Sequence, residues 1–357
     1  MPEYSRFRGS DLRAFVVAVF ERYGMPHDDA VVGAEALVHA DEMGIDSHGV
    51  AHLATHRPYV PGLKDGSVNA KAVPEIVRDS PANALMDAKS GFGPVASTRA
   101  MQLAIEKARA TGAGFVAVTN SKHYGAAAHY ALMAVDHGMI GLSMTIGGLG
   151  VVPTYGRERR LGINPLSVAA PANREHPFLL DIATSVVAGG KLELARMRKE
   201  SIPQGWIVDK AGKPTTNPYD FANGGALLPL GGAPETGSYK GYGLAVMIDI
   251  FCGLLTGFGF AAQLGSVDGR PHFFGAWDVS TFQPLDRFTA MMDEMIQTLH
   301  ATQPAEGAER VMVHGDREFA MLRERTQNGI PLHPEVVENL QRVANDTGIA
   351  LPAPVPV

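Results

Sequence analysis

The stretch TNSKHYGAAAHY, residues 119–130, places a histidine between a strand-like run and a helix-like run. We expect a strand over residues 114–120, then a helix with Ser121 as its N-cap that ends at Gly138. As the second residue of that helix, His123 would face unpaired backbone N–H groups and the positive end of the helix dipole, which lower its pKa. A neutral imidazole near pH 7 can take a proton from a substrate hydroxyl and return it in the reverse reaction. The alternative is a histidine that only caps the helix or packs in the core.

A second group of histidines stands in DSHGVAH, residues 46–52. Ser47 can cap a turn here, and in a helical segment His48 and His52 share one face at the i, i+4 spacing. The pair is then a hydrogen-bonding pair that faces a substrate, or two exposed histidines of a loop. No carboxylate stands between them and no third ligand is near, so zinc is disfavoured and no metal is expected.

Three further segments combine polar groups with turn-forming residues. DIATS, residues 181–185, ends an apolar strand with a carboxylate and two hydroxyls, which suits a ribose or phosphate and equally a turn. In ETGSYKGYG, Lys240 stands among glycines at a helix start, where it suits a closely approached anion or is simply exposed. MVHGDRE, with Gly315 and Asp316, is read as a turn first and as a site second.

Several familiar motifs are absent from the 357 residues. No G-x-G-x-x-G follows a strand, because SGFGPV, YKGYGLAV and IGGLGVV each fail the spacing, so there is no Rossmann fingerprint. Neither a P-loop nor H-E-x-x-H occurs. A hydrolase is disfavoured, since no G-x-S-x-G elbow or Ser-His-Asp order is found.

The composition is that of an ordinary globular protein, with 45% hydrophobic and 19% charged residues. A net charge of −6 argues against a nucleic-acid surface, and an anionic substrate would need local positive groups. Cys252 is the single cysteine, so no intramolecular disulfide forms, and without a signal peptide at the start we expect a cytoplasmic protein. The apolar run 243–262 is long enough to span a bilayer, but Asp249 and several glycines favour a buried helix over a membrane span.

The chain pattern suits two domains or one large domain with a helical appendage. Helices are expected from Ser10 and from Asp28, and a last helix from Pro334. Between them, strands are expected at EIVRD, NALMDA, MIGLSMTI, LSVAAP and PFLLDIA. The Gly/Pro-rich segment 209–241 is expected to be a long functional loop.

Taken together, six segments resemble one family. DSHGVAHL, TNSKHYGAAAHYALMA, LGINPLSVAAP, LDIATSVVAGGKL, GSYKGYGLAVMIDI and GIPL, in this order, resemble the malate/L-lactate dehydrogenases that bind NAD(P) without a Rossmann domain. The likeness runs from about residue 10 to 345. It implies an α+β fold and a homodimer, with a nucleotide-binding domain at 73–269 built on a largely antiparallel sheet. A second domain, built from both chain ends (1–72 and 270–357), would meet the first at the active site.

The resemblance also assigns roles to residues. It makes His123 the acid/base that takes the hydroxyl proton while hydride leaves the same carbon for nicotinamide, and it makes His48 a residue that orients the substrate. The implied substrate-binding residues are Ser47, His52, Arg57 and Tyr59. The residues implied to contact the cofactor, NAD or NADP, are Ser121, Tyr124, Gly125, Asp181, Ile182, Ala183, Lys240, Gly241, His314, Gly315 and Asp316.

One departure from the family bears on the substrate. Four residues after its histidine the family usually places an arginine that clamps the substrate carboxylate, and this chain has His52, which cannot replace a bidentate guanidinium. The following segment is about three residues longer, so Arg57 or His56 is a candidate for the missing charge, and Tyr59 for the family's nearby aromatic residue. TIGGLGVVP, residues 145–153, also replaces a more polar family segment. Both changes indicate a substrate other than malate or lactate.

The sequence therefore predicts an NAD(P)-dependent oxidoreductase that interconverts a small 2-hydroxy acid and its 2-oxo acid. Two alternatives stay open. One is a reductase of a cyclic imino acid, where His123 would matter less because an imine carries its own proton. The other is a non-catalytic nucleotide-binding protein that has lost the carboxylate clamp.

Overall fold

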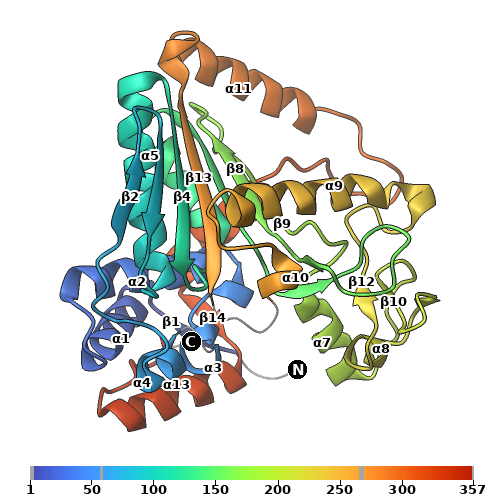
Figure 1. The fold of residues 1–357 in the computed structure, drawn as a ribbon, viewed down its shortest axis with the longest axis horizontal. Helices are drawn as coiled ribbons and strands as arrows, with labels where there is room; N and C mark the ends of the chain where they lie inside the picture. The colour runs from blue at the N-terminus through green and yellow to red at the C-terminus, as the bar shows by residue number, and fades with distance from the viewer. Residues whose placement is uncertain (1–3, 57–58, 265–268, 356–357) are drawn as a thin grey trace.

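A seven-stranded mixed sheet forms the centre of the computed structural model, which describes residues 4–56, 59–264 and 269–355 (Figure 1). Within this sheet only one pair of described strands, β3 with β4, is parallel, and the other pairs are antiparallel. In spatial order the strands are β2 (Glu75–Asp79), β3 (Asn83–Asp87), β4 (Ala113–Ser121), β13 (Arg270–Asp278), β5 (Met139–Thr145), β8 (Leu166–Ala170) and β9 (Phe178–Ile182). The expected α+β fold with a largely antiparallel sheet is thus confirmed.

Alternation along the strands gives this sheet two apolar faces. On β13, Phe274 packs into the core beneath α5 (Gly93–Thr111) and α6 (Ala127–Val135), whereas Phe273 packs on the opposite face. The strands expected from the sequence therefore form, and α5 makes the crossover that joins the parallel strands β3 and β4.

The opposite face is covered in part by the apolar segment 243–262. It forms α9 (Ser238–Ile248), which continues as a π-helix (Asp249–Leu254), and then α10 (Ala261–Leu264). The expectation of one buried helix is wrong, because Ile250, Leu254 and Leu255 are exposed. Among the described helices, none is both long and apolar enough to cross a bilayer.

Both chain ends pack into one core. Strand β1 (Ser5–Phe7) pairs antiparallel with β14 (Ile330–Leu332), and the neighbouring helices bury their apolar faces against each other. The helical elements of this region are α1 (Gly9–Arg22), α2 (His27–Glu42), the 3-10 turn Asp46–His48, α3 (Ala51–Thr55), α4 (Val60–Asp65) and α13 (Pro334–Thr347). The expected helices near both ends therefore form.

A smaller sheet lies at the right of Figure 1 beside α7 (Gly189–Arg198). Its strands are β11 (Pro214–Thr215), β10 (Ile207–Val208), β12 (Ala226–Leu227), β6 (Leu149–Val151) and β7 (Leu161–Gly162). The segment 209–241 is therefore not a plain loop, since it contributes β11, α8 (Tyr219–Ala222), β12 and the 3-10 turn Pro234–Thr236. Strands of two residues are too short to show a period in sequence.

Beyond β13 the chain forms a 3-10 turn (Val279–Thr281), α11 (Leu285–His300), which projects from the top of Figure 1, and α12 (Asp316–Asn328). The division of the chain into two domains stays a prediction. Its boundary at residue 270 nevertheless cuts off β13, which pairs with both β4 and β5 inside the large sheet. A boundary after β13 would keep this sheet whole.

Candidate active site

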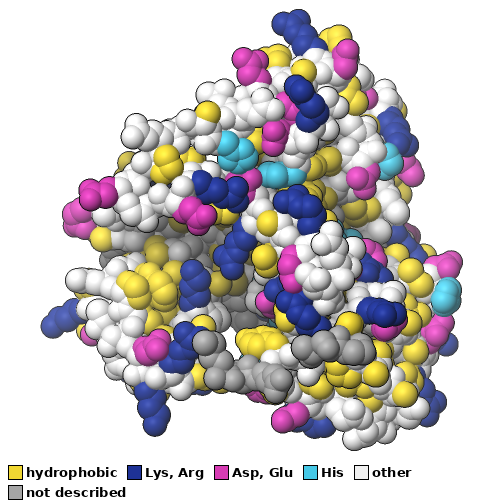
Figure 2. Space-filling view, turned by 180° about the vertical axis from the view of Figure 1, so that it is seen from behind, with side chains coloured by type: hydrophobic (Ala, Val, Ile, Leu, Met, Phe, Trp, Pro, Cys, Tyr) yellow, Lys and Arg dark blue, Asp and Glu magenta, His cyan; other side chains and the backbone are white. Residues whose placement is uncertain are grey.

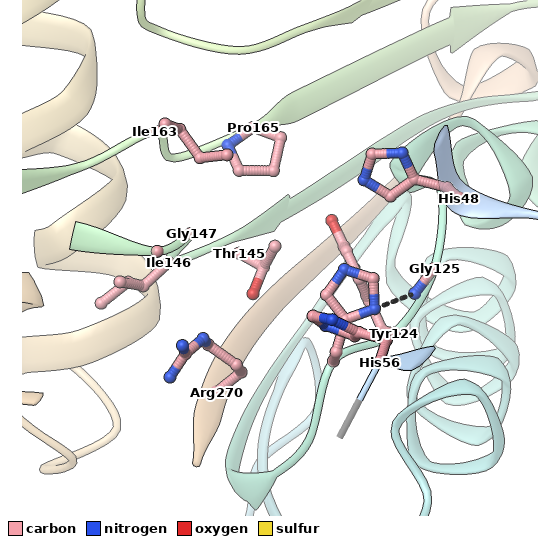
Figure 3. Close-up of a pocket in the computed structure, with 12 residues that line it drawn as sticks. His48, His56, Tyr124, Gly125, Thr145, Ile146, Gly147, Ile163, Pro165 and Arg270 are labelled. Atoms are coloured by element: carbon pink, nitrogen blue, oxygen red, sulfur yellow. Dashed lines mark hydrogen bonds between the residues drawn. The ribbon is translucent and has the colours of Figure 1, made fainter. Parts of the chain in front are cut away.

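A cavity of about 250 Å³ opens where β4 and β5 end and β13 begins, near the 3-10 turn Asp46–His48 (Figure 3). One wall carries histidines and the facing wall is apolar and glycine-rich. The lining residues are His48, His56, His123, Tyr124, Gly125, Thr145, Ile146, Gly147, Gly148, Ile163, Pro165 and Arg270.

His123 lies in this cavity, but not on a helix. Strand β4 runs to Ser121 and α6 begins only at Ala127, so His123 occupies the turn between them. The helix dipole therefore does not explain its protonation state. Its pKa is nevertheless well below the usual value, first because of burial and then because of the neighbouring histidines and Arg270. The expected neutral imidazole thus rests on desolvation.

Two contacts hold the imidazole of His123. Its Nδ1 accepts a hydrogen bond from the backbone N–H of Gly125 at 3.3 Å, the dashed line in Figure 3, and lies 3.0 Å from the hydroxyl of Tyr59. Tyr59 is fully buried, and burial raises its pKa, so its hydroxyl stays protonated and can donate. When Nδ1 accepts, the neutral ring carries its proton on Nε2 and can donate from there. Uptake of a substrate proton at Nε2 requires the other tautomer, in which Nδ1–H donates to the Tyr59 oxygen.

The histidines expected from DSHGVAH gather around His123. The rings of His48 and His123 stack at 5.6 Å, and those of His52 and His56 at 4.5 Å. Burial, with smaller repulsion from neighbouring histidines, lowers the pKa of His48 to about 4 and of His52 to about 3, so both are uncharged near pH 7. Stacked rings do not direct their lone pairs to one point, and no group of three metal-ligating side chains occurs among the described residues.

The residues predicted to bind substrate differ in whether the structure places them at the cavity. Tyr59 contacts the candidate acid/base, and the exposed Ser47 places its hydroxyl 2.8 Å from Nδ1 of His48, which holds that ring. His52 does not line the cavity, and its buried Nδ1 has no hydrogen-bond partner within the described part of the chain. Arg57 lies outside the described residues.

Sequence reasoning missed His272, which is fully buried at the start of β13. Its Nε2 lies 2.9 Å from Ser121 Oγ and 3.0 Å from Lys122 O, and its Nδ1 lies 2.8 Å from Thr145 Oγ1. Its ring stacks on Tyr124 at 4.5 Å with an interplanar angle of 2°. These contacts tie β13 to the ends of β4 and β5 and thereby position the backbone at His123.

The facing wall was noticed in the sequence only as the segments TIGGLG and LGINPL. Its geometry depends on Asn164, a buried residue at φ 33°. The side chain accepts from the Gly147 N–H at 3.1 Å and donates to Ala245 O at 2.8 Å and to Asp249 at 3.0 Å. Asn164 thus joins the wall of the cavity to helix α9 and its π-helical continuation.

Among the residues expected at the cofactor, Tyr124 and Gly125 line the cavity, while Ser121 is buried against His272. Asp181 accepts a hydrogen bond from the N–H of Ala128 at 3.3 Å, at the start of α6, and burial raises the pKa of this carboxyl to about 7. Its neighbour Ile182 pairs with Leu166, next to Pro165 in the cavity wall, so the segment Asp181–Ala183 lies one strand away.

The other expected cofactor residues lie outside this cavity. Lys240 is exposed, and Gly241 packs closely against Leu230, because a Cβ at Gly241 would come within 2.4 Å of that backbone. Asp316, the first residue of α12 after the turn with His314 and Gly315, accepts from His176 at 2.7 Å and from His300 at 2.9 Å. Together with the Val313 N–H, these bonds hold its pKa at about 2. Their cofactor roles stay predictions.

An α+β fold with a tyrosine-bound, neutral histidine in a small enclosed cavity defines the candidate site of an acid-base enzyme. Residues 7–341 match the family model described as malate/L-lactate dehydrogenase, so the chain belongs to that family of hydroxy acid dehydrogenases. The resemblance noted in the sequence is thereby confirmed.

Named relatives span nearly the whole chain. A malate dehydrogenase of Pyrococcus abyssi is 43% identical over 351 residues, which cover 97% of this chain and 96% of the relative. An L-sulfolactate dehydrogenase of Methanocaldococcus jannaschii is 34% identical, with coverages of 94% and 96%. The solved malate dehydrogenase of Entamoeba histolytica superposes with a TM-score of 0.94 at 29% identity, over 98% of this chain and 100% of that one.

Proposed function

We propose that this protein is an NAD(P)-dependent dehydrogenase that interconverts a small 2-hydroxy acid and its 2-oxo acid, with His123 as the acid/base. The observation that carries the proposal is the contact of Nδ1 of His123 with Tyr59 and Gly125, which leaves Nε2 for a substrate oxygen. In oxidation the neutral imidazole, with its own proton on Nδ1 and donated to the Tyr59 oxygen, takes the hydroxyl proton at Nε2, and in reduction the imidazolium returns that proton.

The residues around the cavity fit a nicotinamide cofactor. A Cβ built on Gly148 would meet no atom within 4 Å, and one on Gly125 only the Tyr59 hydroxyl at 3.9 Å, so a flat ring can approach both backbones. Figure 2 shows a hollow beside the small sheet with Lys and Arg side chains gathered along it, a charge that suits phosphates. When bound, the cofactor supplies or accepts the hydride.

The test follows NADH or NADPH absorbance with a panel of 2-oxo acids and cyclic imino acids. We expect oxidation of one nucleotide by a 2-oxo acid, lost in His123→Ala and retained in His137→Gln, which removes an exposed histidine. Turnover of an imino acid that survives His123→Ala would instead support imine reduction, the activity named for a solved relative from Pseudomonas syringae, a delta1-piperideine-2-carboxylate reductase 29% identical to this chain. Nucleotide binding without turnover would leave the non-catalytic alternative.

We also propose that the protein is a homodimer. The residues Leu254, Leu255 and Phe282 expose 54%, 59% and 78% of their surface, and exposed large apolar side chains of this kind are typical of an interface. Light scattering should give twice the 38.0 kDa chain mass, and Leu255→Glu should shift it toward one chain. A wild-type monomer would refute the dimer. The cytoplasmic location stays a prediction.

A further inference from the structure

The proposed substrate carries a carboxylate at neutral pH, and an enclosed carboxylate needs a cation or several N–H donors. Two of the histidines that line the cavity are disfavoured as the cation. His48 is neutral at pH 7, and the pKa of His123 lies well below its usual range, chiefly because of burial. A guanidinium, which stays charged at any pH near neutral, is the stronger candidate.

Arg270 is the only Lys or Arg among the described residues that line the cavity. It is the first residue of β13, where it pairs with Ser121, two residues before His123 on the neighbouring chain segment. Its Nη1 donates to the carbonyl of Gly269 at 2.7 Å, which orients the guanidinium. Figure 3 shows this group across the cavity from His48, below Thr145 and Ile146.

The placement of Arg270 suits the chemistry of a 2-oxo acid. Carboxylate and carbonyl sit on adjacent carbon atoms, so the cation and the proton donor that bind them must lie close together. Arg270 meets this requirement, since it lines the same cavity as His123 and pairs across the sheet with Ser121, two residues before His123. A guanidinium also presents parallel N–H groups that match both carboxylate oxygens.

The described lining residues include no second Lys or Arg and no Asp or Glu. Ile146, Ile163 and Pro165 are apolar, and the hydroxyl of Thr145 is already bonded, at 3.0 Å from Pro271 O and 2.8 Å from His272 Nδ1. A second carboxylate or a sulfonate on the substrate would therefore be buried against apolar side chains.

We propose that Arg270 binds the carboxylate of the substrate, and that the cavity selects 2-oxo acids with one carboxylate and an apolar substituent. This inference rests on the proposed function, because it assumes a 2-oxo acid at His123. The proposed substrate differs from those in the names of two relatives, the 43% identical malate dehydrogenase and the 34% identical L-sulfolactate dehydrogenase. Malate and sulfolactate each carry two acidic groups.

The first experiment measures binding, so that it does not depend on turnover. Oxamate carries a carboxylate next to an amide carbonyl, and its dissociation constant is measured by calorimetry with the nucleotide present. We expect Arg270→Met to weaken binding on the order of 100-fold, and Arg270→Lys to weaken it less because it keeps the charge and loses the fork. Arg310→Met, which removes an exposed arginine, is the matched control and should bind as the wild type does.

Equal oxamate binding by the wild type and Arg270→Met would overturn the assignment, as would no binding by the wild type. The same holds if Arg57→Met causes the loss and Arg270→Met does not. If oxamate binding depends on Arg270 but no 2-oxo acid is turned over, the proposed function fails and the carboxylate site stands.

The second experiment tests the substrate class. We expect kcat/KM for 3-methyl-2-oxobutanoate to exceed that for oxaloacetate at least about tenfold in the wild type, since one unpaired buried charge costs at least one factor of ten. A preference for oxaloacetate would refute the single-carboxylate selectivity. Circular dichroism of each variant confirms that a loss reflects the substituted side chain and not misfolding.

Discussion

Lowering the pH from 6.5 to 5 should destabilise the folded protein by about 3 kcal/mol, because several buried histidines are neutral in the folded state. Burial lowers the pKa of His48 to about 4 and that of His52, His129 and His272 to about 3. In the unfolded chain these groups titrate near 6.5, so below that pH the unfolded state binds more protons. Each group then costs ~1.7 kcal/mol over this range, because the unfolded imidazole is half protonated at pH 6.5 and almost fully protonated at pH 5, or ~7 kcal/mol for the four.

Two carboxyl groups act in the opposite direction. Burial raises the pKa of Asp41 to about 8 and of Asp181 to about 7, so both are protonated in the folded protein between pH 6.5 and 5. Unfolded aspartates are ionised there, and the folded state gains ~2 kcal/mol for each group as the pH falls. The histidines outnumber them, and a net loss of about 3 kcal/mol is a large part of the ~5–15 kcal/mol by which proteins are stable.

The assay is equilibrium urea unfolding at pH 7.5, 6.5 and 5, followed by tryptophan fluorescence. Replacing one buried histidine by an uncharged side chain, in His52→Gln, should reduce the loss between pH 6.5 and 5 by ~2 kcal/mol. His137→Gln removes an exposed imidazole and controls for the substitution itself. A free energy of unfolding that is unchanged or higher at pH 5, or a His52→Gln slope equal to the wild type, would refute the reasoning.

Three further predictions concern the cavity. His123→Gln should lower kcat by ~10²–10⁴. In the wild type, kcat/KM for oxidation of the hydroxy acid should fall only below pH 6.5, because oxidation needs the neutral imidazole. An inflection above pH 6.5 would contradict this. Tyr59→Phe removes the hydroxyl that lies 3.0 Å from Nδ1 of His123 and should lower kcat about tenfold. An unchanged kcat would show that this hydroxyl does not assist His123. Gly147→Ala places a Cβ 2.4 Å from Ile163 and should lower the free energy of unfolding by ~1–3 kcal/mol. The Cβ of Gly148→Ala meets open space and should leave the free energy of unfolding unchanged. Equal melting temperatures of the two variants would contradict this contrast.

Local motifs predicted which histidines gather at the site. His48 and His52 stand four residues apart, and the turn after β4 brings His123 to them, as the family resemblance implied. The sequence did not predict the local conformation correctly, because Gly125 at φ 83° and the extended backbone of Ala126 delay the helix to residue 127. The low pKa was therefore expected for the wrong physical reason.

The residues that sequence reasoning missed are held by non-local pairing. His272 and Arg270 stand about 150 residues after His123, and only the insertion of β13 between β4 and β5 brings them to the cavity. A nine-residue strand shows its apolar period in sequence but not its partners, so no spacing rule connects these residues to His123. Asn164 was likewise hidden, because its role depends on the approach of α9 to the segment before β8.

The electrostatics of the cavity link substrate binding to the proton that the reaction needs. In the proposed mechanism, reduction of a 2-oxo acid requires the imidazolium of His123, which burial, the neighbouring histidines and the charge of Arg270 disfavour. A substrate carboxylate paired with Arg270 cancels that repulsion and adds a negative charge beside the ring, so the imidazolium becomes easier to form once substrate is bound. An arginine at position 52 would not be needed for this coupling, because the cation that binds the carboxylate is the one that had opposed protonation of His123.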